Sequence, residues 1–292
     1  MGRDAFSSYH PAVNFLFFVG AIGFGVVIQH PAYLAAGAVC GLVYYLLLHG
    51  WKGLKLLGVM IPMFLLITLI NPLVNTYGRT VLFTYFGRKW TLEAMVYGMV
   101  LGGMFVLMMV WFGCYNVVLT SDKFVCLFGS LIPALSLLLV MVLRLIPSFM
   151  RKTKQIIGAR NSIGRGGNEN TSLRDKAESG MTVLSALTDW ALEGSIITAD
   201  SMRARGYGSA KRTSFRIYRM TARDWVVLGV EAVLGMLVIL TVAGGGTDAG
   251  FTYQITVAPV TWGYAAYWAF LLIPTVIQIK EEIQWRIILS KI

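Results

Sequence analysis

A short basic segment, Arg203-Ala204-Arg205-Gly206-Tyr207-Gly208, carries the residues best suited to recognition chemistry in this sequence. Small residues flank Arg205 on both sides and leave its guanidinium free of steric cover. The planar fork of an arginine suits a carboxylate or a row of backbone carbonyls on a partner. The same residues also fit a helix that ends at a C-cap glycine, with arginine against the negative end of the helix dipole. Composition alone leaves both interpretations open.

Patterns for catalysis or metal binding are scarce elsewhere. His10, His30 and His49 are isolated, and the sequence has no His-Glu-x-x-His, nucleophile elbow or Cys-x-x-Cys pair. The phosphate-binding pattern Gly-x-x-x-x-Gly-Lys-Ser/Thr is also missing. We therefore expect no catalytic residue, no metal and no cofactor, and we expect any ATP to be hydrolysed by another chain.

One segment near the C-terminal end of the sequence fits a known catalytic pattern. The residues Glu281-Glu282-Ile283-Gln284-Trp285-Arg286 fit the Glu-Glu-x-x-x-Arg pattern of CAAX-type intramembrane proteases. Those enzymes need histidine-bearing helices further along, and none of the six residues after Arg286 is histidine. The groups that would activate water are therefore absent, and we interpret the pattern as chance in an amphipathic tail.

Composition places these residues in a membrane protein. Hydrophobic residues make up 57% of the 292 residues, and the mean hydropathy is +0.68, well above the level of a soluble chain. A helix that crosses the ~30 Å hydrocarbon layer needs about 20 apolar residues. Uncharged stretches predict six such spans and hence an all-α, polytopic helical membrane protein: 13–29, 32–48, 56–74, 95–119, 226–243 and 260–279.

A polar block at 148–224 interrupts the spans and indicates the orientation. It holds 14 of the 25 Lys and Arg residues but only seven acids, and basic residues near spans are retained in the cytoplasm. We therefore expect this block and the C-terminal tail inside the cell, and the loop 244–259 outside.

The orientation of the front half is open, because basic residues occur in two adjacent loops. Lys52 and Lys55 argue that one loop is inside, whereas Arg79, Arg88 and Lys89 argue the same for the next. The answer depends on whether 124–146 crosses the membrane. If it does not, four spans precede it and the N-terminus is cytoplasmic.

Two long helices are predicted within the block, one from Pro147 into Ser162 and one from about Leu173 to Arg205, parted by a glycine-rich break. Ser172 or Thr171 can cap the second helix, and Gly206 ends it. Some 30 residues make a rod of ~45 Å, which suggests an arm that transmits force. The expected organisation is four spans in 1–120, the cytoplasmic region 121–224 with helices ending near 162–165 and 204–206, and two spans in 225–292.

Three segments carry a family resemblance. The residues 199–208, ADSMRARGYG, resemble the Ala-Arg-Gly signature of the transmembrane T component of energy-coupling factor (ECF) transporters, the EcfT and CbiQ family. Arg144-Leu145-Ile146-Pro147 is similar to the Arg-x-Ile-Pro of that family, and Thr120-Ser121-Asp122 to the turn before it. The resemblance implies an L-shaped helical scaffold whose two coupling helices each end in an Arg-centred motif that docks into an ATPase groove.

The second of these motifs corresponds to Ala204, Arg205 and Gly206, next to Arg203. The first falls on Ser162, Ile163 and Gly164, which have no arginine in the middle. Either the neighbouring Arg160 or Arg165 replaces the missing guanidinium, or Ile163 makes an apolar contact instead.

The resemblance implies a non-catalytic coupling subunit of the bacterial cytoplasmic membrane. Its partners would be two ABC ATPase subunits and a small integral substrate-binding S component, and the cargo a vitamin or a transition-metal ion such as cobalt or nickel. The sequence does not name the cargo, because specificity would belong to the S component.

A self-contained secondary transporter would show internal repeats and interrupted helices, and its long arms would be unexplained. The basic residues of 211–223 are expected to meet anionic lipid headgroups rather than nucleic acid. Glu231 is an ionisable residue within a predicted span and hence a functional candidate, although it lies near enough to Trp225 to reach the interface.

Overall fold

The computed structural model describes residues 4–75, 78–85, 88–129, 133–164, 173–209, 218–251 and 255–289. Helices dominate these residues, and the expected all-α fold of a polytopic membrane protein is confirmed. The chain divides into two compact units. The membrane unit comprises Met1–Phe124 and Tyr218–Ile292, and the arm unit comprises Val125–Ile217.

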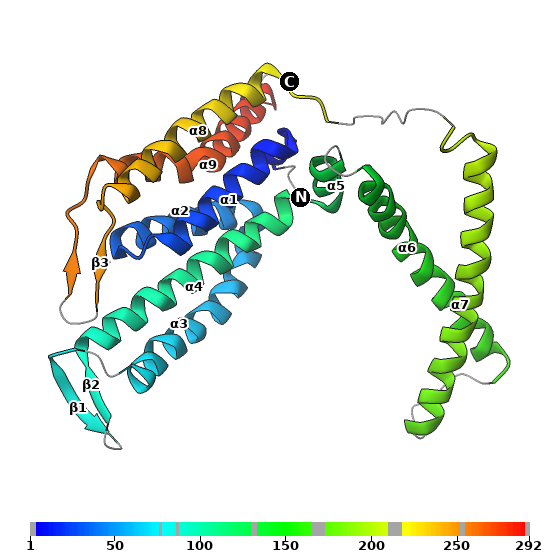
Figure 1. The fold of residues 1–292 in the computed structure, drawn as a ribbon, viewed down its shortest axis with the longest axis horizontal. Coiled ribbons are helices and arrows are strands. Elements are labelled where there is room, and N and C mark those ends of the chain that lie inside the picture. Colours follow the sequence, from blue (N-terminus) through cyan, green and yellow to red (C-terminus); the bar gives the residue numbers. More distant parts are fainter. Residues whose placement is uncertain are drawn as a thin grey trace. The chain divides into compact units, whose positions relative to one another are not determined.

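The membrane unit consists of helices that run side by side (Figure 1). Its elements are the 3-10 turns η1 (Phe6–Ser8) and η2 (Gly50–Gly53), the helices α1 (Pro11–Val27), α2 (Pro31–His49), α3 (Leu54–Val74), α4 (Leu92–Val118), α8 (Ala222–Ala243) and α9 (Trp262–Leu289), and two short antiparallel hairpins, β1 (Val81–Tyr85) with β2 (Arg88–Thr91) and β3 (Ala249–Gly250) with β4 (Thr256–Val257).

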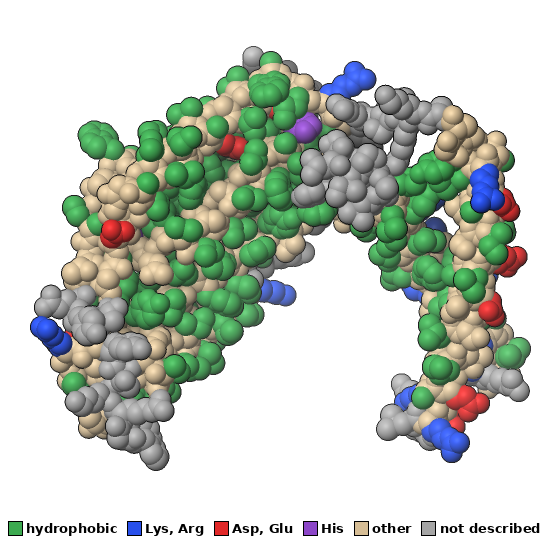
Figure 2. All heavy atoms as spheres, in the orientation of Figure 1, with side chains coloured by type: hydrophobic (Ala, Val, Ile, Leu, Met, Phe, Trp, Pro, Cys, Tyr) green, Lys and Arg blue, Asp and Glu red, His purple; other side chains and the backbone are tan. Residues whose placement is uncertain are grey.

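Each of the six predicted spans overlaps one of these helices. Among the described residues, α2, α4, α8 and α9 are long and apolar enough to cross a membrane, and α1 and residues Gly58–Val74 of α3 form shorter apolar helices. Apolar side chains cover much of the face of the membrane unit seen in Figure 2. The chain is therefore a multi-pass membrane protein of the cell membrane.

Two of the isolated histidines begin helices. The Nδ1 atoms of His10 and His30 each accept a hydrogen bond, from the backbone N–H of Ala12 and Ala32, both at 3.2 Å. A proline follows each histidine at the first helical position, where its missing N–H costs nothing. The two His-Pro pairs are thus N-terminal caps.

An aromatic core holds α1, α4 and α9 together. Phe17 stacks on Phe270 with ring centroids 5.2 Å apart and meets the edge of Trp111 at 5.5 Å. The indole N–H of Trp111 donates to the carbonyl of Gly37 in α2 at 3.2 Å. Polar and apolar contacts therefore link four helices at one depth of the bundle.

Two groups of hydrogen bonds join chain segments at the two opposite ends of the bundle. At one end, Nε2 of His30 lies 3.0 Å from the carbonyl of Ala258, which joins the α1–α2 turn to the α8–α9 loop. At the other end, Lys123, Asp224 and Gln278 all bond to the N-terminal residues Asp4–His10. The chain therefore leaves the bundle after α4 and re-enters it at α8 on the same side.

The stretch 124–146 is divided between two helices, and residues 130–132 between them lie outside the described part of the chain. Helix α5 (Ser121–Gly129) ends before α6 (Pro133–Ser162) begins, and neither belongs to the helices of the described chain that are apolar and long enough to cross. The expected helix start at Pro147 differs from the structure, because α6 starts at Pro133 and includes Pro147. That proline removes one helical hydrogen bond, but the helix continues on both sides of it.

The arm unit is built from α6 and α7 (Leu173–Ala204), which are about 45 and 48 Å long. They cross near their middles (Figure 1), where the ring of Phe149 meets the ring of Trp190 edge-on at 5.5 Å. The ammonium group of Lys152 lies 5.8 Å from the same indole ring. The expected cap of α7 at Thr171 or Ser172 lies outside the described residues.

Candidate coupling site

The end of α7 positions Arg205 by a specific backbone motif. The N–H of Tyr207 donates to the carbonyl of Met202 at 3.0 Å, and the N–H of Gly206 to that of Arg203 at 2.9 Å. With φ of +78° at Gly206, these two bonds form a Schellman C-cap. A side chain would be strained at this φ, so the glycine fixes where the helix stops.

Arg205 is presented to the surroundings by this cap. Ala204, Arg205 and Gly206 are all exposed, and so is Arg203. Within the described part of the chain, the Arg205 guanidinium makes no hydrogen bond and no ion pair, although the acidic residues of α7 lie on the same helix. A free guanidinium on a rigid helix end is ready to bind a carboxylate or backbone carbonyls of another chain.

The end of α6 shares two features of this cap, a glycine with positive φ and the hydrogen bond of its N–H, but has no arginine before the glycine. The N–H of Gly164 donates to the carbonyl of Asn161 at 3.1 Å, and Gly164 has φ of +74°. The Ser162 hydroxyl bonds back to the carbonyl of Gly158 at 3.0 Å. Ile163 therefore occupies the position before the left-handed glycine that Arg205 occupies in α7, and its side chain is 70% exposed.

The two neighbouring arginines differ in what the structure says of them. Arg160 lies in the last turn of α6 and is half-buried, whereas Arg165 lies outside the described residues. Among the described residues at this end, Ile163 is an exposed apolar side chain, next to the exposed polar side chains of Asn161 and Ser162.

The two helix ends are placed evenly about the crossing of the arm unit. From Phe149 to Ile163 the α6 axis runs about 21 Å, and from Trp190 to Arg205 the α7 axis runs about 22 Å. The C-terminal ends point in different directions from the crossing (Figure 1). The arm unit thus offers two separate contact points, Ile163 and Arg205, at nearly equal distances from the crossing of its helices.

The protease-like pattern in α9 has a simpler role. Nη2 of Arg286 donates to Oε1 of Glu282 at 2.8 Å in an exposed ion pair one helical turn apart. Within the described residues, no group of three or more His, Cys, Asp or Glu side chains could hold a metal ion. This arrangement stabilises a surface helix by a few tenths of a kcal/mol.

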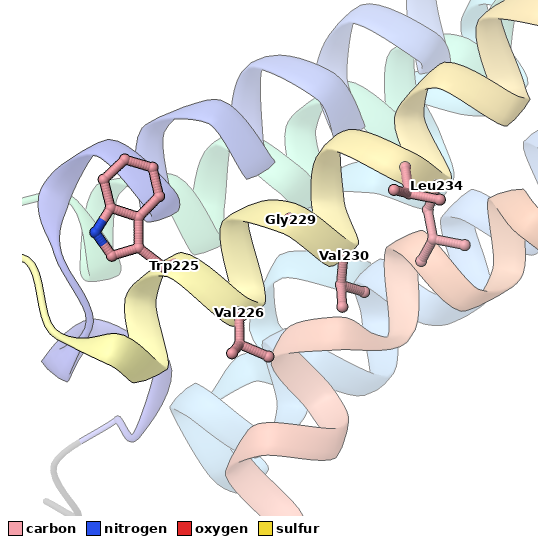
Figure 3. A pocket seen from close by; sticks show the side chains of 6 residues that line it. Trp225, Val226, Gly229, Val230 and Leu234 are labelled. Atoms are coloured by element: carbon pink, nitrogen blue, oxygen red, sulfur yellow. The ribbon is translucent and has the colours of Figure 1, made fainter.

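A shallow groove of about 390 Å³ runs along α8 (Figure 3). Its lining offers no polar side chain to orient a small solute beyond the indole N–H of Trp225, and Trp225, Val226 and Val233 are each more than 60% exposed. The groove therefore suits an apolar surface such as lipid. It is lined by Trp225, Val226, Gly229, Val230, Val233 and Leu234.

Sequence reasoning missed a buried polar cluster at the end of the bundle where α4 ends and α8 begins. Lys123 is 4% exposed and Asp224 is 3% exposed, and both bond to the N-terminal residues. Asp224 was detectable, because Thr221 and Asp224 stand at capping-box spacing and form that box. Lys123 gave no signal, since a lysine near a span is normally a surface residue.

Part of the chain is similar to a known membrane transport protein. The chain is 35% identical over 109 residues to the energy-coupling factor transporter transmembrane protein EcfT of Lacticaseibacillus paracasei. The match covers 36% of this chain and 40% of that protein. No family model matches the chain. The EcfT relative confirms the resemblance that the sequence motifs indicated.

Proposed function

We propose that this chain is the transmembrane coupling subunit of an ECF-type ABC uptake transporter. In this role α6 and α7 receive the ATP-driven motion of two ATPase subunits, and the membrane unit passes it to a separate substrate-binding S component. The chain itself catalyses nothing. The arm unit and the end of the bundle that carries residues 4–10 face the cytoplasm.

The observation that carries this proposal is the pair of helix ends in the arm unit. Each presents one exposed side chain, Arg205 or Ile163, immediately before a glycine with positive φ. Two similar docking points suit two similar partner subunits, as the ATPases of an ABC transporter are. The sequence similarity to EcfT is independent of this geometry and supports the same kind of complex.

The arm unit also has apolar surface for a membrane partner. Five large side chains of α7 are each more than half exposed, which is costly for a helix that stays in water. We assign this surface to contact with the S component or lipid. These side chains are Met181, Leu184, Leu192, Ile196 and Ile197.

We propose only the chemical class of the transported substrate, not its identity. By the family resemblance it is a vitamin or a transition-metal ion such as cobalt or nickel. The groove on α8 offers no group that would select either, so selection is assigned to the S component.

The test is purification of the tagged chain from detergent-solubilised membranes of its native cells. Wild type should bring down Walker-type ATPases and a small integral protein. Arg205→Glu should lose the ATPases, because it places a carboxylate where a cation is expected to bind.

Arg174→Glu is the matched control, since it reverses an exposed charge at the opposite end of the same helix and should retain the ATPases. Purification of wild type without any ATPase would refute the proposed function. Equal retention in Arg205→Glu would remove Arg205 from the docking site.

A further inference from the structure

Residues Asp4–His10, called the N-terminal bracket, are built firmly into the membrane unit. Phe6 is fully buried, and its ring lies 5.4 Å from the ring of Phe17 in α1. The N–H of Ala5 donates to Oε1 of Gln278 in α9 at 2.7 Å. The hydroxyl of Tyr44 in α2 donates to Oδ2 of Asp4 at 3.0 Å. The bracket is therefore joined to α1, α2 and α9.

The bracket also holds the point where the chain leaves for the arm unit. Nζ of Lys123, two residues before that unit begins, donates to the carbonyl of Ser7 at 2.6 Å and to its hydroxyl at 2.8 Å. A third bond, of 2.8 Å, goes to the carbonyl of Val118 at the end of α4. These bonds tie the start of α5 to the bracket.

The Lys123 ammonium has a further acceptor in α1. In the amide orientation that satisfies both of its ends, Asn14 accepts from Nζ of Lys123 at 3.1 Å and donates to the carbonyl of Phe6 at 2.9 Å. Burial lowers the pKa of Lys123 to about 8, and the nearby Asp4 carboxylate opposes this shift. A buried cation with its donors aimed at fixed acceptors defines one position for the residue.

The same bracket holds the point where the chain returns. Oδ1 of Asp224, in the first turn of α8, accepts from the N–H of His10 at 3.0 Å. Its Oδ2 accepts from both the N–H and the hydroxyl of Thr221, each at 2.7 Å. The guanidinium of Arg223 lies 5.5 Å from the centre of the Tyr9 ring. Residues 221–224 are thereby fixed to the bracket as well.

We infer that the N-terminal bracket is the common anchor of both chain connections to the arm unit, with Lys123 and Asp224 as its positioning residues. The inference rests on the proposed function. The arm unit can move the membrane unit only if its two connections to that unit are held in place. Here Lys123 and residues 221–224 are bonded to one short segment, which is itself bonded to three helices. Motion of the arm unit is thus passed to α1, α2 and α9.

The test compares wild type with Lys123→Met and Asp224→Asn in the purified complex with its ATPases. Lys123→Met keeps an unbranched side chain but removes the donors. Asp224→Asn keeps one acceptor and removes the carboxylate. Lys280→Met, at an exposed position of α9, is the matched control. Amide hydrogen exchange is followed without nucleotide and after trapping with ATP and vanadate.

Both variants should keep their ATPases, because Arg205 and Ile163 are unchanged. The amides of residues 6–10 should exchange about tenfold faster or more, as expected for losing bonds to a charged group. Trapping should alter exchange in the distant α8–α9 loop, residues 244–251, in wild type and Lys280→Met. This change should be lost in Lys123→Met and Asp224→Asn, an effect that a purely structural role of these residues would not produce.

Unchanged exchange at residues 6–10 in both variants would overturn the anchor. So would a trapping response at 244–251 that stays at the wild-type size in both. If wild type brings down no ATPase, the proposed function fails separately, and exchange at residues 6–10 in the isolated chain still decides whether Lys123 and Asp224 fix the bracket.

Discussion

Two glycines, Gly25 and Gly37, lie close against the side chain of Leu107 of α4. A Cβ on Gly37 would overlap Cδ1 of Leu107 and lie 2.8 Å from the hydroxyl of Tyr267. Gly37→Ala should therefore destabilise the protein by about 1–3 kcal/mol, as overpacking does, measured by thermal unfolding in detergent. Gly23→Ala, whose Cβ meets nothing within 4 Å, should not lower the melting temperature. Equal behaviour of the two variants would contradict this packing.

Glu231 is buried in α8, 5% exposed, and neither carboxyl oxygen has a hydrogen-bond partner within the described structure. An unpaired buried polar group costs free energy that an apolar side chain of similar shape avoids. We expect Glu231→Met to stabilise the fold by about 1–3 kcal/mol in the same thermal assay. Glu282→Met, which removes an exposed ion pair, should change it by less than about 1 kcal/mol. A destabilised Glu231→Met would indicate a partner, such as a bound water, for the carboxyl group.

Single residues were predictable where local geometry decides. The glycine after Arg205 predicts a capped helix end, which is the geometry observed. His10 and His30 were recognised only as isolated, although His-Pro before an apolar run is itself a start signal. The contacts of Lys123 depend on a residue 116 positions away, and no local pattern contains that information.

At the scale of elements, the left-handed glycine at the end of α7 sets the direction of Arg205. Gly206→Ala should cost about 1–2 kcal/mol at this φ and weaken ATPase binding by several-fold without any change of charge. Pull-down titration of the ATPases measures the effect. Gly194→Ala, the same change inside α7 with open space around it, should leave the affinity unchanged. If both variants bind alike, the cap does not position the arginine.

Hydrophobic patterning placed each helix of the membrane unit, but it missed the end of α9, which continues ten residues beyond the predicted span to Leu289, and the start of α6 in the arm unit. Apolar runs fixed α2, α4 and α8 to within a few residues, because lipid leaves a span no alternative to helix. The sequence predicts a helix start at Pro147, whereas α6 runs through this proline from Pro133. One lost hydrogen bond is a small loss in a helix of 30 residues, and a proline near the middle of such a run therefore does not mark a boundary.

At the scale of the whole molecule, the bonds at the two ends of the bundle predict which loops are accessible from outside. Single cysteines at Asp248 and Thr80 should react with an impermeant thiol reagent in intact cells. Cysteines at Trp51, which is 88% exposed, and at Arg174 should react only after permeabilisation. Reaction of the Trp51 position in intact cells would reverse the proposed orientation of the bundle.

The distances in sequence between bonded partners of the N-terminal bracket also bear on how the protein is made. Ala5 bonds to a residue 273 positions later, and His10 to one 214 positions later. The bonds to Asp224 and Gln278 can therefore form only after α8 and α9 have been synthesised, whereas those to Tyr44 and Lys123 can form earlier. The bond between Ala5 and Gln278 is then the last of these to form, and nascent chains stalled before α9 should hold the bracket to α2, α5 and α8 but not to α9.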